Sequence, residues 1–352
     1  MNGSLEGVAV PGGAPASVIV GIGAYVPPNP VTNHDLTARL DTSDEWIRTR
    51  TGISSRHMVL PGQATSDLAV EAGRRALESA GQSGEPGHAE GVDAVVLATT
   101  TPDRACPATA PEVASRLGLG TVAAFDVSAV CSGFLYGLAT AAGLIAAGTA
   151  GRVLLIAADA FTTLVDPHDR ATAVIFADGA GAVVLRAGEP DEPGAVGRVV
   201  LGSDGSLSGL LQVPGGGSRQ RSLGEPVKPG DEFLRMAGRD TYRHAVGRMA
   251  EASRQAVQAA GWGLADIDRL AAHQANARIL ATVADDLGIP EDRRLSNIAH
   301  NGNTVAASIP LLLADATADG SLAAGHRVLL TAFGAGLAWG AATVLWPDVK
   351  PG

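Results

Sequence analysis

The chain has 352 residues, of which 46% are hydrophobic and 18% are charged, and its formal net charge is −10. This composition is typical of a soluble globular protein that buries a large core, in two domains or in one layered unit. It argues against nucleic-acid binding, because neutralising phosphates requires a basic face and the sequence has no cluster of Lys and Arg.

The two cysteines, Cys106 and Cys131, have no CxxC spacing, which excludes a disulfide scaffold and favours a reducing cytoplasm. We expect residues 1–17 to be a disordered lead-in, because they are rich in Gly, Ala and Pro and lack the regions of a signal peptide. The weakly polar stretch 131–150 is dominated by Ala, Gly and Thr, so it predicts a helix buried in protein rather than a membrane span.

Apolar strand-like runs alternate with Ala-rich helical runs through the first half of the chain. The predicted strands of this half are 18–25, 94–100, 123–127, 153–157 and 182–186, and the predicted helices are 66–80, 111–117 and 132–147. This order predicts an α/β fold with a largely buried sheet.

A stretch rich in Pro, Gly and acidic residues, 189–197, separates this half from a second one with the same alternation. The predicted strands there are 199–202, 267–272, 328–332 and 341–345, and the predicted helices are 239–260, 275–287 and 308–318. Segments 151–157 and 325–332 resemble each other in sequence. We therefore expect two duplicated halves, 18–188 and 198–349, with an active site where they meet.

Cys131 stands where a predicted strand runs into a predicted helix. A thiol there lies at the positive end of the helix dipole, beside backbone N–H groups without an intrahelical partner, which favours the thiolate. Free cysteine is also among the most buried residue types, so position alone does not separate catalysis from packing.

Three further motifs lie at comparable strand ends: His273-Gln-Ala-Asn276, the segment 297–303 that ends in Asn303, and the Gly-rich turn 333–336. Each motif also has a purely structural interpretation. A histidine at a strand end often forms hydrogen bonds with nearby protein groups, and Asn-Gly commonly forms a turn. Together with Cys131, they supply a nucleophile, two side-chain hydrogen-bond donors and a turn whose backbone could approach a ligand.

Several motifs in one order make a specific resemblance to a known family. The motifs are 41–53, 126–133, 169–181, 273–276, 302–304 and 333–340. In them the chain resembles β-ketoacyl-acyl-carrier-protein synthase III, a condensing enzyme of the thiolase superfamily. The resemblance covers nearly everything from Val18 to Trp346 and implies an α/β, thiolase-like five-layered αβαβα fold, two pseudo-duplicated halves and a homodimer.

The resemblance also implies a catalytic triad of Cys131, His273 and Asn303. Cys131 would take the acyl group of an acyl-CoA, and the N–H groups of Cys131 and Ala335 would bind the oxyanion. Malonyl-acyl-carrier-protein would then lose CO₂, while His273 and Asn303 bear the charge of the enolate. No metal and no cofactor is implied, since acyl-CoA and the malonyl carrier are substrates.

Further positions would bind the substrates and the carrier. Those implied for CoA and its pantetheine arm are Thr42, Trp46, Arg50, Arg170, Gly238, Ala275 and Asn276. Trp46 would stack on the adenine and the arginines would meet the phosphates. Cys106 and Phe333 would bound the acyl pocket, and Arg243 and Arg278 would dock the acyl carrier protein.

The sequence departs from the family pattern at three places. Cys106 stands where many relatives have a bulky residue that closes the partner's acyl pocket, so we expect a primer larger than acetyl. Asp285 and Asp286 stand where relatives often have lysines that meet the carrier, which puts docking to a generic carrier in question. We interpret His300, close to Asn303, as a structural residue.

Other functions fit the sequence less well. The main alternative is a non-decarboxylating acyltransferase that moves an acyl group from Cys131 to another acceptor, and Asn303 argues against it because simple transfer needs no enolate donor. Thiolase is disfavoured because 333–340 holds no second cysteine, and a dinucleotide-binding dehydrogenase because no GxGxxG occurs. The histidines show no metal-binding spacing, and an inactive scaffold would not need the intact triad.

Overall fold

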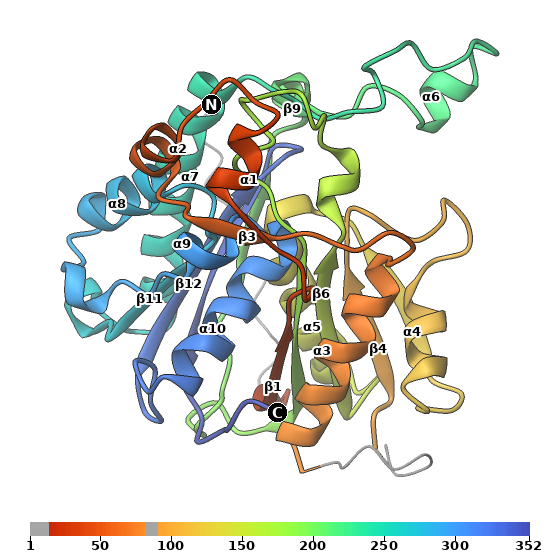
Figure 1. Cartoon of the computed structure of the whole chain (residues 1–352). Helices are drawn as coiled ribbons and strands as arrows, with labels where there is room; N and C mark the ends of the chain where they lie inside the picture. The colour runs from red at the N-terminus through yellow and green to blue at the C-terminus, as the bar shows by residue number, and fades with distance from the viewer. Residues whose placement is uncertain (1–13, 82–90) are drawn as a thin grey trace.

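The computed structural model describes residues 14–81 and 91–352. Two β-sheets alternate with three layers of helices in the order helix, sheet, helix, sheet, helix (Figure 1). This five-layered αβαβα architecture confirms the expected fold class. Most of the predicted lead-in 1–17 lies outside the described residues, but the first strand begins at Ala16, so residues 16 and 17 belong to the sheet.

The first sheet has five strands in the order β1-β7-β6-β4-β5. Its strands are β1 (Ala16–Tyr25), β4 (Ala94–Ala98), β5 (Ala123–Val127), β6 (Arg152–Asp159) and β7 (Gly179–Gly188). β4 is parallel to both of its neighbours, and β7 is antiparallel to both of its own. Because helices cover both faces, β4 and β6 are near-continuous apolar runs, whereas β5 forms a partly exposed edge.

The second sheet repeats this arrangement with the order β8-β13-β12-β11. Its strands are β8 (Val200–Ser203), β11 (Arg269–Ala272), β12 (Arg327–Gly334) and β13 (Ala338–Leu345). These strands correspond in chain order and in position to β1, β4, β6 and β7 of the first sheet. An isolated parallel bridge between Leu270 and Arg294 lies where the first sheet has β5.

The helices form the other three layers. One outer layer packs on the first sheet, a central pair lies between the sheets, and a second outer layer packs on the second sheet. The helices on the outside of the first sheet are α3 (Thr65–Ser79) and α4 (Ala110–Arg116). The central pair is α5 (Gly133–Ala146) and α10 (Ser308–Ala318), and the helices on the outside of the second sheet are α7 (Gly238–Ala259) and α8 (Ala277–Asp286). The largest apolar cluster surrounds α5 and α10.

Glycine at two positions favours the close packing of α5. A Cβ built on Gly137 would lie 2.5 Å from the Leu155 side chain of β6, and one on Gly133 would lie 3.0 Å from Ala306. The absence of side chains there lets the helix approach both the first sheet and the start of the other central helix. The start of α5 is thereby fixed at the boundary between the two halves.

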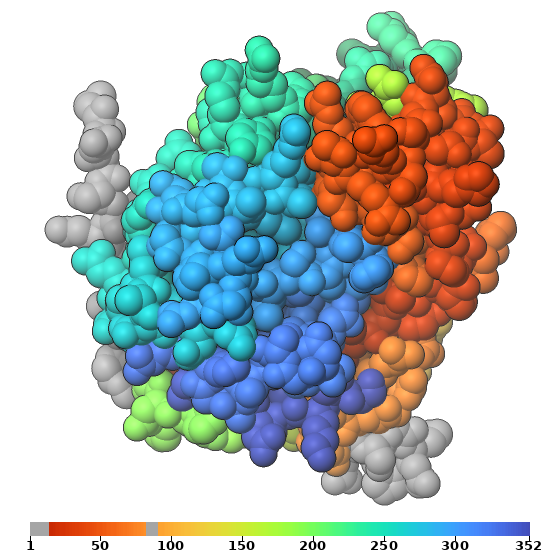
Figure 2. Space-filling view, turned by 60° about the vertical axis from the view of Figure 1, so that its left-hand side comes forward, coloured from red at the N-terminus to blue at the C-terminus, as the bar shows by residue number. Residues whose placement is uncertain are grey.

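A cap of short elements covers one end of the layers. It consists of β2 (Pro30–Thr32), α1 (Asn33–Thr37), α2 (Asp44–Thr51) and β3 (Ser55–His57). Figure 2 shows this N-terminal segment, in red to orange, lying against the blue segment around α8, and the Asn276 amide donates a hydrogen bond to the Arg50 carbonyl there. The cap thus belongs to the first half in sequence but borders the second half in space.

A hairpin of β9 (Leu211–Gln212) and β10 (Arg235–Met236) carries the segment 213–234, which projects from the body with the short helix α6 (Ser218–Arg221) (Figure 1). None of the described helices is both long and apolar enough to cross a bilayer.

Candidate active site

Cys131 lies on a single 3₁₀ turn, Val130–Ser132, between β5 and α5. The residue before it, Val130, has a positive φ of 47°, which is strained for a β-branched residue. Val305 repeats this feature with a φ of 54°, on the matching 3₁₀ turn before α10. The two halves therefore bring two strained turns together, one carrying Cys131 and the other beginning two residues after Asn303.

Burial raises the pKa of the Cys131 thiol well above its usual range, and the charge of Asp159 raises it further. Asp159 ends β6, and burial raises its own pKa to about 7, although its carboxylate accepts N–H groups from Thr100 at 2.7 Å and Ala306 at 3.1 Å. The expectation that the helix N-terminus favours the thiolate is therefore wrong for the free protein. Desolvation of the buried sulfur is the largest cause of the upward shift.

His273 follows directly after β11, and its side chain is 1% exposed. Its backbone N–H donates to the Thr331 carbonyl at 2.8 Å, and its Nδ1 lies 2.6 Å from the Ser308 hydroxyl oxygen. Burial lowers the pKa of His273 to about 3. The imidazole is consequently neutral, with one nitrogen that donates and one that accepts.

The backbone of Asn303 is held by the segment before β7. Its N–H donates to the Ile175 carbonyl at 3.0 Å, and its carbonyl accepts the Ala177 N–H at 2.9 Å. The side-chain Oδ1 accepts the Val305 N–H at 3.0 Å. Within residues 14–81 and 91–352 the Nδ2 group has no hydrogen-bond partner, so it is the part of the amide that can donate to a ligand.

The turn after β12 places backbone directly against the cysteine. A Cβ built on Gly334 would lie 2.8 Å from the Cys131 nitrogen and 3.0 Å from its Cβ, so a side chain does not fit there. In the described part of the chain, neither the Cys131 N–H nor the Ala335 N–H donates to a protein oxygen. Two unpaired backbone donors beside a nucleophile have the chemistry of an oxyanion hole.

A cavity of about 940 Å³ joins these groups. The predicted residues that line it are Cys131, His273, Asn303, Trp46, Arg50, Gly238, Arg243, Ala275, Asn276, Arg278 and Phe333. Cys131 also belongs to a buried apolar cluster that includes Phe161, Phe176, Leu211 and Val305. The cavity thus has a charged mouth and an apolar end, which suits a ligand with an anionic head and an acyl tail.

Four predicted residues do not line this cavity. Ala335 belongs to the turn beside Cys131. Arg170 does not line the cavity itself, but its guanidinium lies over the ring of Trp46, which does. Thr42 is half-buried, and its hydroxyl has no hydrogen-bond partner within the described residues. Cys106 is exposed on the loop between β4 and α4 and does not reach the cavity of its own chain. It can therefore line only the acyl pocket of a second copy.

At the mouth, two guanidinium groups lie over the Trp46 ring. The Arg50 guanidinium is 5.6 Å from the ring centroid and that of Arg170 is 4.9 Å away. Arg170 also donates to the Asp41 carbonyl at 2.7 Å. These cation–π contacts hold positive charge beside an aromatic surface, as recognition of an anionic nucleotide requires.

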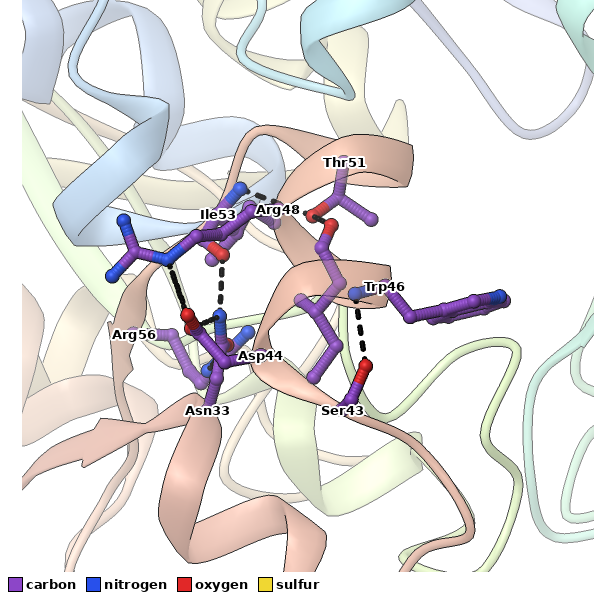
Figure 3. A network of polar contacts seen from close by, with 9 residues as sticks. Asn33, Ser43, Asp44, Trp46, Arg48, Thr51, Ile53 and Arg56 are labelled. Carbon is purple, nitrogen blue, oxygen red and sulfur yellow. Dashed lines mark hydrogen bonds and ion pairs between the residues drawn. The ribbon is translucent and has the colours of Figure 1, made fainter.

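A buried polar network holds α2, which carries Trp46 and Arg50 (Figure 3). The Asn33 amide donates to Asp44 Oδ1 and to the Ile53 carbonyl, both at 2.8 Å. Arg56 is fully buried and donates to Asn33 Oδ1 and to the Val174 carbonyl, again at 2.8 Å. Burial lowers the pKa of Arg56 to about 10, so it remains charged at neutral pH. The network connects the mouth to the segment that pairs with Asn303.

The charges on α7 and α8 differ in how they are paired. Arg243 forms an ion pair with Asp240 on the same helix turn. Arg278 and Arg239 also line the mouth, and within the described residues neither has a carboxylate partner. The mouth therefore retains positive charge that is available to an anionic partner.

Asp285 and Asp286, at the end of α8, both form ion pairs within the chain. Asp285 pairs with Arg294 at 2.7 Å and Asp286 pairs with Arg254 at 3.2 Å. Their negative charges are thus offset locally and oppose an acidic partner less than the sequence alone indicates.

Sequence reasoning missed five residues of the site: Ser308, Asp159, Arg56, Arg239 and Tyr242. Asp159 could have been found, because it follows a predicted strand, as Cys131 and His273 do. Ser308 opens a predicted helix five residues after Asn303, but its contact with His273 depends on tertiary structure. In the parts of the chain with described structure, no group of three or more His, Cys, Asp or Glu is arranged to hold a metal ion.

Known proteins resemble this chain in sequence. Models of 3-oxoacyl-[acyl-carrier-protein] synthase III and of its C-terminal part match residues 125–205 and 257–346. A β-ketoacyl-[acyl-carrier-protein] synthase III 3 of Streptomyces coelicolor is 56% identical over 336 residues, which is 96% of this chain and 99% of that protein.

Solved structures show the same likeness. The crystal structure of 3-oxoacyl-(acyl carrier protein) synthase III from Pseudomonas aeruginosa has 46% identity and a TM-score of 0.87, over 96% of this chain and 100% of that one. The priming β-ketosynthase of the R1128 polyketide pathway has 35% identity and a TM-score of 0.87, over 97% and 99%. The chain belongs to the β-ketoacyl-acyl-carrier-protein synthase III family.

Proposed function

We propose that the protein catalyses the decarboxylative condensation of an acyl-CoA primer with a malonyl thioester of acyl carrier protein, which starts a fatty-acid or polyketide chain. The observation that carries this proposal is that Cys131, His273 and Asn303 line one cavity with a cationic mouth. Family membership supports it, since the relatives are named for this activity.

In the first half-reaction, Cys131 Sγ attacks the carbonyl carbon of the acyl-CoA thioester. The oxyanion forms beside the N–H groups of Cys131 and Ala335, which stabilise it as hydrogen-bond donors. The C–S bond to CoA then breaks. The departing CoA thiolate takes up one proton, which replaces the proton that the Cys131 thiol lost. The products are acyl-Cys131 and free CoA.

In the second half-reaction, the malonyl thioester enters the same cavity. Its carboxylate leaves as CO₂, and the electron pair of the broken C–C bond forms an enolate whose oxygen accepts hydrogen bonds from His273 and Asn303. The enolate carbon attacks the acyl carbonyl and displaces the Cys131 sulfur. All bonds that change belong to thioesters or the carboxylate, so the reaction requires no cofactor and no metal.

Intact-protein mass spectrometry tests the covalent step. We expect incubation with a panel of acyl-CoA thioesters to add one acyl mass to the protein, and the Cys131→Ala variant to show none. Absence of an adduct with every thioester would contradict the proposal.

A non-decarboxylating acyltransferase remains the alternative. The available Nδ2 group of Asn303 favours condensation, because transfer to a hydroxyl or amine leaves no enolate to stabilise. Release of labelled CO₂ from a malonyl thioester, dependent on prior acylation, distinguishes the two reactions.

We propose that Arg243 and Arg278 meet the acidic carrier, with Arg239 as a third cation at the same mouth. The internal pairing of Asp285 and Asp286 supports this placement, because it lowers their repulsion of a negatively charged partner. Substituting Arg278 by Glu should raise the KM for the carrier-bound malonyl group more than it raises the KM for acyl-CoA.

We propose further that the protein acts as a homodimer and accepts a primer larger than acetyl. The exposed position of Cys106 supports a role across the interface, because a small residue there leaves room in the partner's acyl pocket. Competition between acyl-CoA primers tests this: a strict preference for acetyl-CoA over four-carbon and longer primers would refute it.

A further inference from the structure

Ser308, the first residue of α10, contacts the imidazole of His273 and has no part in the reaction described above. Its side chain is buried, with 2% exposed. Its Oγ lies 2.6 Å from His273 Nδ1 and also accepts the Gln274 backbone N–H at 3.2 Å. Two neighbouring residues after β11 therefore converge on one hydroxyl.

The hydrogen bonds of this hydroxyl decide its direction. One lone pair of the oxygen is already occupied by the Gln274 N–H. Among the residues that the structure describes, His273 Nδ1 is the one acceptor within hydrogen-bond distance of the Ser308 O–H. If Nδ1 carried the proton instead, the Ser308 proton would be buried without an acceptor, an arrangement that folded proteins avoid.

We propose that Ser308 is a positioning residue that selects the His273 tautomer with its proton on Nε2. The Ser308 hydroxyl donates to Nδ1, so the neutral ring must carry its proton on Nε2. Within the described chain Nε2 has no hydrogen-bond partner, and His273 lines the cavity together with Asn303. Burial supports the arrangement by keeping the ring neutral.

The tautomer matters for the reaction, and this part of the inference rests on the proposed function. With its proton on Nε2, His273 donates to an enolate oxygen beside the Asn303 amide. With the opposite tautomer, Nε2 would direct a lone pair at the same oxygen and repel it. The selected tautomer also cannot take the Cys131 proton through Nε2, so His273 serves condensation rather than thiol activation.

Nitrogen NMR of the ¹⁵N-labelled histidine rings tests the tautomer without reference to catalysis. The His273 signals are assigned by their loss in the His273→Gln variant. We expect Nε2 to carry the proton in the unmodified protein, and the Ser308→Ala variant to show protonated Nδ1 or a mixture. Protonated Nδ1 in the unmodified protein would overturn the inference, and so would an unchanged tautomer in the variant.

Ser253 on α7 offers a matched control. It is fully buried, and its hydroxyl has no hydrogen-bond partner in the described residues, so Ser253→Ala removes a buried hydroxyl without touching His273. We expect this variant to keep the original tautomer and activity. Ser308→Thr retains a hydroxyl and should therefore restore part of the original tautomer population and part of the activity. A purely structural role of the Ser308 side chain would not require this rescue.

Separate measurement of the two half-reactions links the tautomer to catalysis. Ser308→Ala should lower CO₂ release from the acylated enzyme by about 10- to 100-fold, the range seen when the hydrogen-bond partner that orients a metal-bound histidine is removed. Acylation of Cys131 should stay near its original rate, and equal loss in both half-reactions would refute the catalytic role. If the unmodified enzyme released no CO₂, the proposed function would fail, while the NMR result would still decide the tautomer.

Discussion

Burial changes the pKa values of Cys131 and His273 in opposite directions, and both changes favour the neutral form. An ion pair of thiolate and imidazolium would need the reverse, a lowered thiol pKa and a raised histidine pKa. The free site thus holds a thiol and a neutral imidazole. This arrangement suits a mechanism in which the cysteine and the histidine act in different half-reactions.

The two half-reactions should therefore differ in pH dependence. Acylation should accelerate as pH rises from about 6 to about 9, because the thiolate fraction of a thiol with a raised pKa grows throughout that range. CO₂ release by pre-acylated enzyme should not fall as pH drops from about 8 to about 5, because His273 stays neutral there. Protonation of Asp159 in that interval removes a negative charge, which does not disfavour an enolate.

Stopped-flow measurement of CoA release and of CO₂ release, each across this range, provides the check. Loss of CO₂ release between pH 7 and pH 6, with the midpoint of an ordinary histidine near 6.5, would contradict the neutral imidazole.

Asn303 allows an isosteric test of the enolate donors. The Asn303→Asp variant keeps an oxygen for the Val305 N–H but loses the Nδ2 donor and adds a negative charge facing the enolate. We expect CO₂ release to fall by about 100- to 1000-fold, the effect of removing one oxyanion donor. Acyl-Cys131 should still form, so the adduct seen by mass spectrometry serves as the internal control. Equal impairment of acylation would place Asn303 in the first half-reaction instead.

At the residue scale, the sequence predicts which residues form the site better than it predicts their burial and pKa values. Cys131 and His273 follow strands that periodicity locates, so their convergence could be expected. Asn303 follows the short helix α9 (Ile298–Asn301), so the expectation of a strand end there is wrong. The pKa of Cys131 could not be predicted, because it depends on burial by packing from both halves and on the charge of Asp159. Local position at a helix N-terminus gave the wrong direction of the shift.

Among the elements, the turn after β12 depends on glycine most directly. Gly334→Ala should displace the turn from Cys131, since the new Cβ would lie 2.8 Å from the Cys131 nitrogen and backbone cannot yield as a flexible side chain does. We expect acylation to slow by about 100-fold, as a displacement of order 1 Å at reacting groups does.

Gly143→Ala is the matched control for that change. Gly143 lies on the exposed face of α5 with nothing within 4 Å of a built Cβ, so the variant should be more stable by roughly 0.5–1 kcal/mol and equally active. Thermal unfolding and single-turnover acylation measure both variants. Unimpaired acylation in Gly334→Ala would exclude the turn from the oxyanion site.

The longer elements were predictable and the cap was not. All the predicted strands and helices occur, with ends shifted by a few residues, because each buries one apolar stripe or an entire apolar run. β2, β3 and α2 are short, and their stability comes from buried polar contacts such as those of Asn33 and Arg56. Periodicity carries no signal for such a network, so the support of Trp46 appears only in the structure.

For the whole molecule, β5 and the loop before α4 form one surface of the first half. β5 is the edge of its sheet, and the Asp126 carboxylate on it accepts the N–H groups of Thr109 and Ala110 at 2.8 Å. This contact fixes the loop that carries Cys106 beside the strand. A second copy that paired with the β5 edge would therefore meet Cys106 as well.

The direction of the β5 hydrogen bonds allows a selective disruption of such pairing. The Ala123 N–H donates to Asp93, and the Val127 carbonyl accepts the Thr99 N–H, so these residues face β4. Backbone groups alternate along a strand, so those of Ala124 face the open edge. Ala124→Pro removes an outward N–H and leaves the hydrogen bonds to β4 in place, which is the position where an edge strand tolerates proline.

We expect the unmodified protein to sediment at twice the mass of one chain and the Ala124→Pro variant to sediment at the mass of one. Ala124→Val keeps the outward N–H and should remain dimeric. If Cys106 bounds the acyl pocket of the partner, the proline variant should also lose discrimination between primers, because each cavity then opens to solvent. Dimeric Ala124→Pro would place the interface elsewhere, and a monomeric unmodified protein would refute both the homodimer and the role of Cys106 in primer choice.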